Sequence, residues 1–105
     1  MSRNDYISGW LELSEPLGEE KVDSLVKRIM FSGSVSFERH AEEEMRKDDL
    51  GKIDIFDVLE NGSCLRSDLR DGSWRYRIQK NDVVVVVAFP SDNRVKVVTA
   101  WKRKG

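Results

Sequence analysis

Residues 73–102 read SWRYRIQKNDVVVVVAFPSDNRVKVVTAWK, and most of the fold class follows from this stretch. At its start, large apolar residues alternate with cations, which is the period of a strand with one buried face. Residues 83–88 are five valines and an alanine, which is typical of a strand buried on both faces. The turn sequences at 81–82 and 90–93 are too short to join anything but antiparallel neighbours. We therefore predict three consecutive antiparallel strands.

The same alternation assigns side chains to the two faces of the predicted sheet. In the first strand, one face carries Trp74, Tyr76 and Ile78, and the other carries Arg75 and Arg77. In the last strand, over 94–102, we expect one face to carry Val95, Val97, Thr99 and Trp101, and the other Lys96, Val98, Ala100 and Lys102.

Upstream of these strands, the apolar residues recur at the three- and four-residue steps of amphipathic helices. The spacing predicts helices over 18–30, about 37–47 and about 53–60, and the segment 64–69 can add an edge strand. The expected fold is α+β, with N-terminal helices packed on one face of a three- or four-stranded antiparallel sheet.

The chain has 105 residues and a mass of 12.1 kDa, which suits one domain and excludes a two-domain enzyme with a dinucleotide cleft. Its net charge of −1 conceals an uneven distribution. Residues 1–60 carry eight Lys/Arg against fifteen Asp/Glu, a net of −7, and residues 61–105 carry ten against four, a net of +6. This division predicts a cationic face suited to an anionic partner.

The sequence also indicates where the protein works and which cofactors to expect. The N-terminus shows no secretory signal, and the longest apolar run, 83–89, is far shorter than the ~20 residues of a membrane helix. The single cysteine, Cys64, and the single histidine, His40, exclude Cys-based zinc sites and multi-His metal centres. We expect a cytoplasmic protein without a metal, cofactor or membrane association.

The arginines of the first strand suggest what the cationic face binds. Arg75 and Arg77 are two residues apart in a strand, so their guanidinium groups point to the same side, where they suit phosphates or a dense carboxylate patch. The aromatic residues Trp74, Tyr76 and Trp101 lie among them, a combination found in proteins that bind single-stranded nucleic acid. The alternative is that the arginines only solvate the outer face while the aromatic residues fill the core.

His40 is the side chain best suited to exchange protons near neutral pH, and Glu44 lies one helical turn further on. A His–Glu pair with Arg77 nearby could supply the base, acid and cation that metal-free RNA cleavage requires. In the alternative reading, His40 borders the apolar stripe of its helix and pairs with Glu44 without any catalytic role.

Several of these stretches together resemble the small prokaryotic family called domain of unknown function 4258. They are FERHAEEEMRKD at 37–48, DVLENG at 57–62, WRYRI at 74–78, the valine strand, and VVTAW at 97–101. The resemblance covers about 35–102. We expect one domain over 1–105, with an N-terminal extension and first helix over 1–33 and a family-like core over 34–105.

The resemblance implies a fold similar to RelE-like toxins of toxin–antitoxin systems. Such toxins are metal-independent ribonucleases, often acting on messenger RNA, that an antitoxin neutralises. It implies His40 as the acid/base residue, Arg75 and Arg77 as phosphate ligands, and Thr99 and Trp101 as lining of the cleft. The family's Arg after His-Ala-x-x is Glu44 here. Either Arg46 and the strand arginines take over phosphate binding, or catalysis has been lost.

The expected function is therefore that of a toxin-like, metal-independent endoribonuclease acting on single-stranded RNA or mRNA. The expected catalytic residues are His40, Glu44 and Arg77, and the expected RNA-binding residues are Arg46, Arg75, Thr99, Trp101 and Lys102. The expected partners are RNA and an antitoxin with an acidic segment. Two alternatives remain: a non-catalytic module that binds RNA or protein with the same face, and a homodimer formed through the aromatic sheet face.

Overall fold

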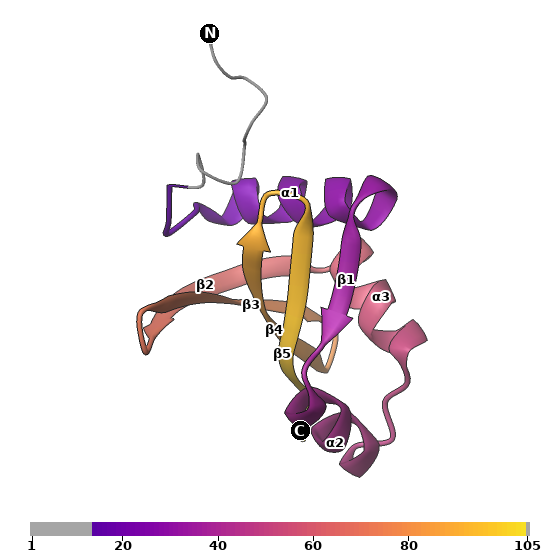
Figure 1. Cartoon of the computed structure of the whole chain (residues 1–105). Helices are drawn as coiled ribbons and strands as arrows, with labels where there is room; N and C mark the ends of the chain where they lie inside the picture. The colour runs from indigo at the N-terminus through magenta and orange to yellow at the C-terminus, as the bar shows by residue number, and fades with distance from the viewer. Residues whose placement is uncertain (1–13, 105) are drawn as a thin grey trace, which may run out of the picture.

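The computed structural model describes residues 14–104, which form three helices and five strands (Figure 1). In chain order they are α1 Glu19–Ser32, β1 Ser34–Phe37, α2 Arg39–Lys47, α3 Lys52–Asn61, β2 Ser63–Arg70, β3 Ser73–Lys80, β4 Val83–Ser91 and β5 Arg94–Lys102. The predicted α+β class is confirmed. The part of the predicted N-terminal extension before Ser14 lies outside the described residues.

The five strands make one mixed sheet in the order β1-β5-β4-β3-β2. The prediction of three or four strands, all antiparallel, is wrong because β1 lies parallel to β5. β1 is only four residues long, and its partner comes after every other element of the chain. Short turn sequences predict pairing only between strands that are neighbours in the chain. They cannot indicate that β1 pairs with a strand at the other end of the sequence.

The second helix begins at Arg39, two residues later than predicted, because Phe37 belongs to β1. Phe37 pairs with Val97 of β5, and its ring meets that of Phe56 at 6.1 Å between centroids. Ala41 and Met45 are buried as expected. Phe37 contacts the same core, so its spacing of four from Ala41 imitates a continuous helical stripe.

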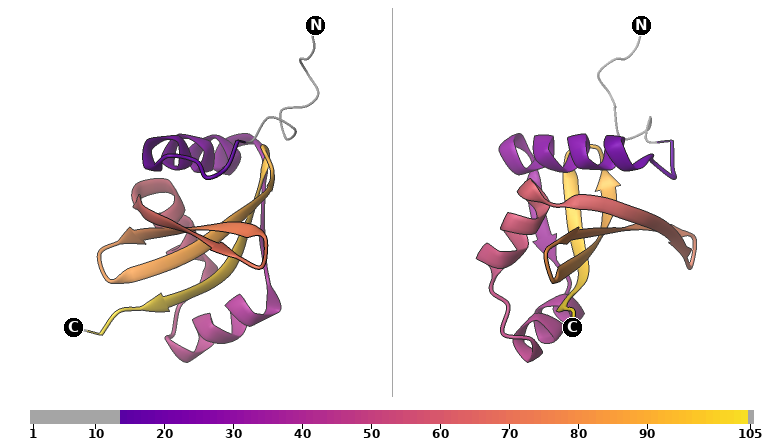
Figure 2. Two further views of the ribbon diagram at one scale, coloured as in Figure 1. Left: turned by 90° about the vertical axis from the view of Figure 1, so that its left-hand side faces the viewer. Right: turned by 180° about the vertical axis from the view of Figure 1, so that it is seen from behind.

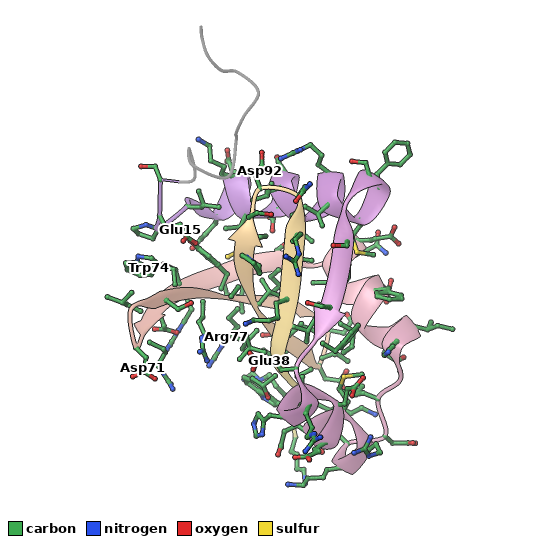
Figure 3. The ribbon with its side chains drawn as sticks, viewed as in Figure 1. Glu15, Glu38, Asp71, Trp74, Arg77 and Asp92 are labelled. Carbon is green, nitrogen blue, oxygen red and sulfur yellow. The ribbon has the colours of Figure 1, made fainter. Side chains whose placement is uncertain are left out.

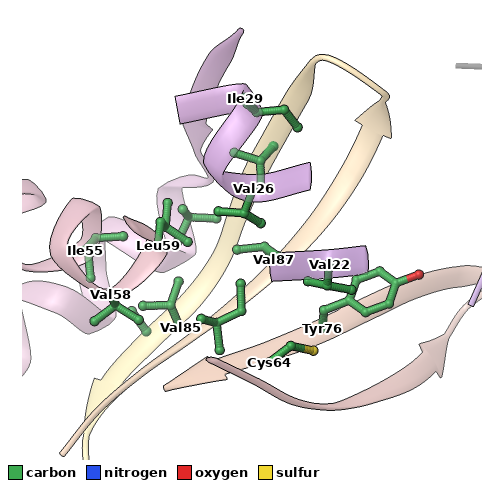
Figure 4. Close-up of a cluster of buried hydrophobic side chains, with 14 of the residues drawn as sticks. Val22, Val26, Ile29, Ile55, Val58, Leu59, Cys64, Tyr76, Val85 and Val87 are labelled. Atoms are coloured by element: carbon green, nitrogen blue, oxygen red, sulfur yellow. The ribbon is translucent and has the colours of Figure 1, made fainter. Parts of the chain in front are cut away.

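Two helices, α1 and α3, cover one face of the sheet, and we call the opposite face the uncovered face. Figure 2 shows α1 and α3 packed against one side of the sheet, and α2 apart from them beside the lower part of β5. α2 lies at one end of the molecule, where it packs against β5. The core lies between the sheet and the two covering helices (Figure 4), and its fully buried members include Val22, Val26, Ile29, Ile55, Val58, Tyr76, Ile78, Val85, Val87, Val95 and Val97.

The faces predicted for β3 are confirmed. Tyr76 and Ile78 are fully buried in the core. Arg75 and Arg77 lie between them in the sequence and therefore point to the uncovered face.

The faces predicted for β5 are wrong beyond Val98 because the pairing with β4 is irregular there. Val87 pairs with Val97 but Val86 pairs with Thr99, so Val98 is an extra residue on β5. An inserted residue of this kind reverses the side to which all later residues point. Ala100 therefore joins Val95 and Val97 in the core, and Thr99 turns to the uncovered face.

Two ionisable groups are buried against the covered face. The Tyr76 hydroxyl accepts a hydrogen bond from the backbone N–H of Leu17 at 3.1 Å and donates one to the Glu15 carboxylate at 2.8 Å. Burial, with the Glu15 charge, raises the pKa of Tyr76 above its ordinary range. Burial and the nearby Asp23 carboxylate raise the pKa of the Cys64 thiol to about 11. As the pH rises, the two side chains would lose their protons first in an unfolded chain. In the folded protein both stay neutral to a higher pH.

We expect the free energy of unfolding to fall as the pH rises from about 9, the usual pKa of a thiol, to about 11. Over this range the folded protein keeps the Cys64 proton that the unfolded chain releases, so rising pH favours unfolding. Urea titrations at several pH values in this range measure the slope. The Cys64→Ala variant should show a smaller slope. An unchanged slope would mean that Cys64 does not cause the loss of stability.

Candidate nucleic-acid interface

The uncovered face contains a pocket of about 150 Å³ to which four strands contribute. We call it the arginine pocket, and its lining consists of Asp68 and Arg70 from β2, Arg75 and Arg77 from β3, Val86 from β4, and Val98, Thr99 and Trp101 from β5. Three guanidinium groups against one carboxylate give this lining a formal charge of +2. A small concave site with this charge favours a compact anion.

The arginines of β3 have hydrogen-bonding capacity left for a ligand, and one of them is held in place by an aromatic ring. The Nε atoms of Arg75 and Arg77 are buried, and neither has a hydrogen-bond partner among the described residues. The Arg77 guanidinium also lies over the Trp101 ring at 5.2 Å from its centroid, an arrangement that holds the guanidinium in place. Buried donors without acceptors are costly, and a bound anion would satisfy them.

The carboxylate of Asp68 is already shared with a cation outside the pocket. Arg66 donates two hydrogen bonds to it, from Nε at 3.2 Å and from Nη2 at 3.3 Å. Asp68 and Arg75 face each other across β2 and β3. Because Asp68 is ion-paired with Arg66, its carboxylate offsets less of the positive charge of Arg75 and Arg77 than it would without that partner.

His40 and Glu44 lie outside this pocket, on α2. His40 is exposed, and the described residues give it neither a hydrogen bond nor an ion pair. Glu44 is half-buried and forms an ion pair with Lys47 at 3.1 Å. The predicted catalytic pair is therefore near the surface of one helix, and the residues lining the arginine pocket include neither of them.

The contacts of α2 show which way this pair faces. Residues two apart on a helix are separated by about 200°, so His40 and Glu42 occupy opposite flanks. The Glu42 carboxylate lies 3.6 Å from Lys52 of α3, which covers the core side of the sheet. His40 and Glu44 are thus on the flank turned away from α3. In Figure 3, Arg77 extends from the β2–β3 hairpin on the side where α2 lies, with Glu38 labelled at the start of that helix.

Some of the predicted RNA-binding residues line the arginine pocket, and others lie outside it. Arg75, Thr99 and Trp101 are brought together in it, as expected from the resemblance. Arg46 is exposed and lies one turn from Glu42, on the flank opposite His40. Lys102 is exposed, and its backbone N–H donates a hydrogen bond to Asp48 at 2.8 Å. Of the two groups considered for binding phosphate, the strand arginines and not Arg46 line a pocket.

Sequence reasoning missed the contributions of β2 and of the valines. Asp68 and Arg70 line the pocket because β2 pairs with β3 at the register Asp68–Arg75. The alternation of Arg66, Asp68 and Arg70 along the possible edge strand was the available signal, but it does not fix the register. Val98 points to the pocket by ordinary alternation after Val97, and the irregular pairing of β5 adds Thr99 and Trp101 to the same side.

Residues 14–104 show neither a metal-binding cluster nor a membrane-spanning helix. No three His, Cys, Asp or Glu side chains of this part of the chain gather closely enough to hold a metal ion. None of its helices combines the length and the apolar character that crossing a membrane would require.

The chain matches a known protein family. No curated protein and no solved structure matches the chain. Residues 37–102, more than half of the chain, match the family described as domain of unknown function 4258 (DUF4258). The matched segment begins at the last residue of β1 and ends with β5, so it contains all the strands of the arginine pocket together with His40 and Glu44. The chain therefore belongs to the DUF4258 family.

Proposed function

We propose that this protein is a toxin-like, metal-independent endoribonuclease that holds single-stranded RNA in the arginine pocket and cleaves it with His40 and Glu44. The observation that carries the proposal is the pair of buried, unpartnered Nε atoms on Arg75 and Arg77, next to Trp101. A phosphate oxygen accepts from such donors, and an aromatic ring offers a surface on which a base stacks whatever its identity.

The cleavage step uses the nucleotide's own 2′-hydroxyl as the nucleophile. The Glu44 carboxylate, which is ion-paired with Lys47, accepts the 2′ proton while the 2′ oxygen forms a bond to the adjacent phosphorus. The bond from phosphorus to the 5′ oxygen breaks, and the His40 imidazolium donates a proton to that oxygen. Arg77 stabilises the additional negative charge on the phosphorus centre. The products are a 2′,3′-cyclic phosphate and a free 5′-hydroxyl, so neither water nor a metal enters the step.

The position of α2 supports the catalytic roles of His40 and Glu44 in one respect, and in another it favours a protein that binds RNA without cleaving it. His40 and Glu44 occupy the flank of α2 turned away from α3, and Arg77 extends toward the same end of the molecule. However, both lie outside the pocket lining, and Glu44 stands where the resemblance leads us to expect an arginine. The second candidate function is a non-catalytic module that binds RNA, or an acidic segment of an antitoxin, in the same pocket.

A single assay with the full chain distinguishes the two candidates. Fluorescent single-stranded RNA is incubated with the protein in EDTA, binding is followed by anisotropy, and cleavage is followed on a denaturing gel. We expect binding that weakens steeply between about 50 and about 200 mM salt, because bound phosphates release counterions. Cleavage under these conditions supports the nuclease, and binding without cleavage supports the module. No binding even at low salt would contradict both.

A further inference from the structure

β2 forms one edge of the sheet, and its second half has nothing paired to its outer side within residues 14–104. Its first half is occupied by α1, since the Asp23 carboxylate accepts a hydrogen bond from the backbone N–H of Cys64 at 2.9 Å. Beyond that contact, Leu65 and Leu69 are 47% and 56% exposed. The pairing of β2 with β3 shifts between Cys64 and Arg66, so the regular part of the edge begins at Arg66. A regular edge that carries an exposed leucine, here Leu69, is a template for pairing with another strand.

The hairpin turn determines which backbone groups of this edge are free. Asp71 and Gly72 have φ values of 51° and 78° and connect β2 to β3 as a two-residue loop. Such a loop is closed by a hydrogen-bonded pair, here Arg70 and Ser73. Because hydrogen-bonded and non-hydrogen-bonded pairs alternate along an antiparallel ladder, the N–H and C=O groups of Ser67 and Leu69 point away from β3.

The side chains along this edge are self-complementary. If a second copy lies antiparallel with Ser67 opposite Ser67, then Arg66 faces Asp68 of the second copy, and Asp68 faces Arg66 of the second copy. Arg66 and Asp68 already lie on one face of β2, where they are ion-paired. We propose that two copies of this chain associate through β2 in this register, forming a homodimer with one continuous sheet.

The charges select this register over the neighbouring one. Centring the pair on Asp68 would place Asp68 opposite itself and Arg66 opposite Arg70, and like charges directly opposite each other destabilise a strand pair. Centring it on Ser67 gives two attractive Arg–Asp pairs instead. The symmetry axis then runs perpendicular to the sheet, so both uncovered faces point to the same side. If the proposed function holds, one RNA strand could reach both arginine pockets.

The test measures the mass of the full chain by sedimentation equilibrium over a range of concentrations, without RNA. We expect a mass approaching twice 12.1 kDa as the concentration rises. Arg66→Asp should weaken dimerisation by about tenfold, because both ion pairs become pairs of like charge. Combining Arg66→Asp with Asp68→Arg should restore the dimer, since the exchanged charges are again complementary. As a control, Ile53→Asp introduces an aspartate on the exposed surface of α3, away from β2, and should leave dimerisation unchanged.

Three results would overturn the proposal. One is a monomer at every concentration, and another is a dimer that Arg66→Asp does not weaken. The third is a doubly exchanged variant that folds, as judged by circular dichroism, but does not regain the dimer. Because the mass is measured without RNA, each of these results stands apart from the outcome of the RNA-binding assay.

Discussion

Arg77→Ala is expected to weaken the binding of single-stranded RNA by about 5-fold to 150-fold, the effect of losing roughly 1–3 kcal/mol of charged and stacking contacts. The substitution removes a guanidinium that lines the arginine pocket, and it removes the cation held over Trp101. Anisotropy titrations at several salt concentrations measure both the affinity and its dependence on salt. The slope of log affinity against log salt should fall by about 0.7, the value for one phosphate contact on a single strand.

Two further variants separate the charge of Arg77 from its geometry and from general effects of charge. Arg77→Lys keeps a positive charge but lacks the planar group, so we expect an affinity between those of the wild type and Arg77→Ala. Arg28→Ala removes a guanidinium from α1, where Arg28 contacts the backbone oxygen of Asp92. It should leave RNA binding nearly unchanged. Equal losses for Arg28→Ala and Arg77→Ala would show that binding follows net charge and not the pocket.

His40→Ala is expected to reduce the rate of RNA cleavage by about 10²- to 10⁴-fold, which is the usual contribution of one general acid or base. RNA binding should change little, because His40 is exposed on α2 and lies outside the arginine pocket. The cleavage rate is measured in EDTA at saturating protein. In cells, inducible expression of the wild type should arrest growth, and expression of His40→Ala should not.

Glu43→Ala is a suitable control for the His40 variant. Glu43 is an exposed residue of the same helix, and neither the pocket nor the proposed cleavage step includes it. Its cleavage rate should therefore match that of the wild type. If His40→Ala cleaves as fast as Glu43→Ala, the assignment of His40 is wrong. If the wild type binds RNA without cleaving it, the non-catalytic module is the correct function.

Local patterns in the sequence predicted the elements whose partners are their neighbours. The alternation of Trp74 to Ile78 correctly placed Arg75 and Arg77 together on the face opposite the core, because side chains on a strand alternate with a fixed period of two. The three helices were found from their apolar stripes, and the largest shifts are two residues, at the end of α1 and at the start of α2. The stretches that carried the resemblance lie within the segment matched by the DUF4258 family.

The composition of the arginine pocket depended on contacts between distant segments. Thr99 and Trp101 were expected on the same face as Val95 and Val97, and the irregular pairing at Val98 moved them to the face of the arginines. A sequence read one strand at a time cannot show this irregularity, because it exists only in the register between β4 and β5.

The sequence by itself determined the α+β class, the strand that carries both arginines and the family to which the chain belongs. Only the tertiary structure decided that β1 pairs with β5 as a parallel edge strand, and that β2 supplies Asp68 and Arg70 to the arginine pocket. It also decided that His40 lies outside this pocket. The physical reason is the range of the interactions. Periodicity arises from bonds between neighbouring residues, whereas register and convergence arise from packing between segments that meet only after the chain has folded.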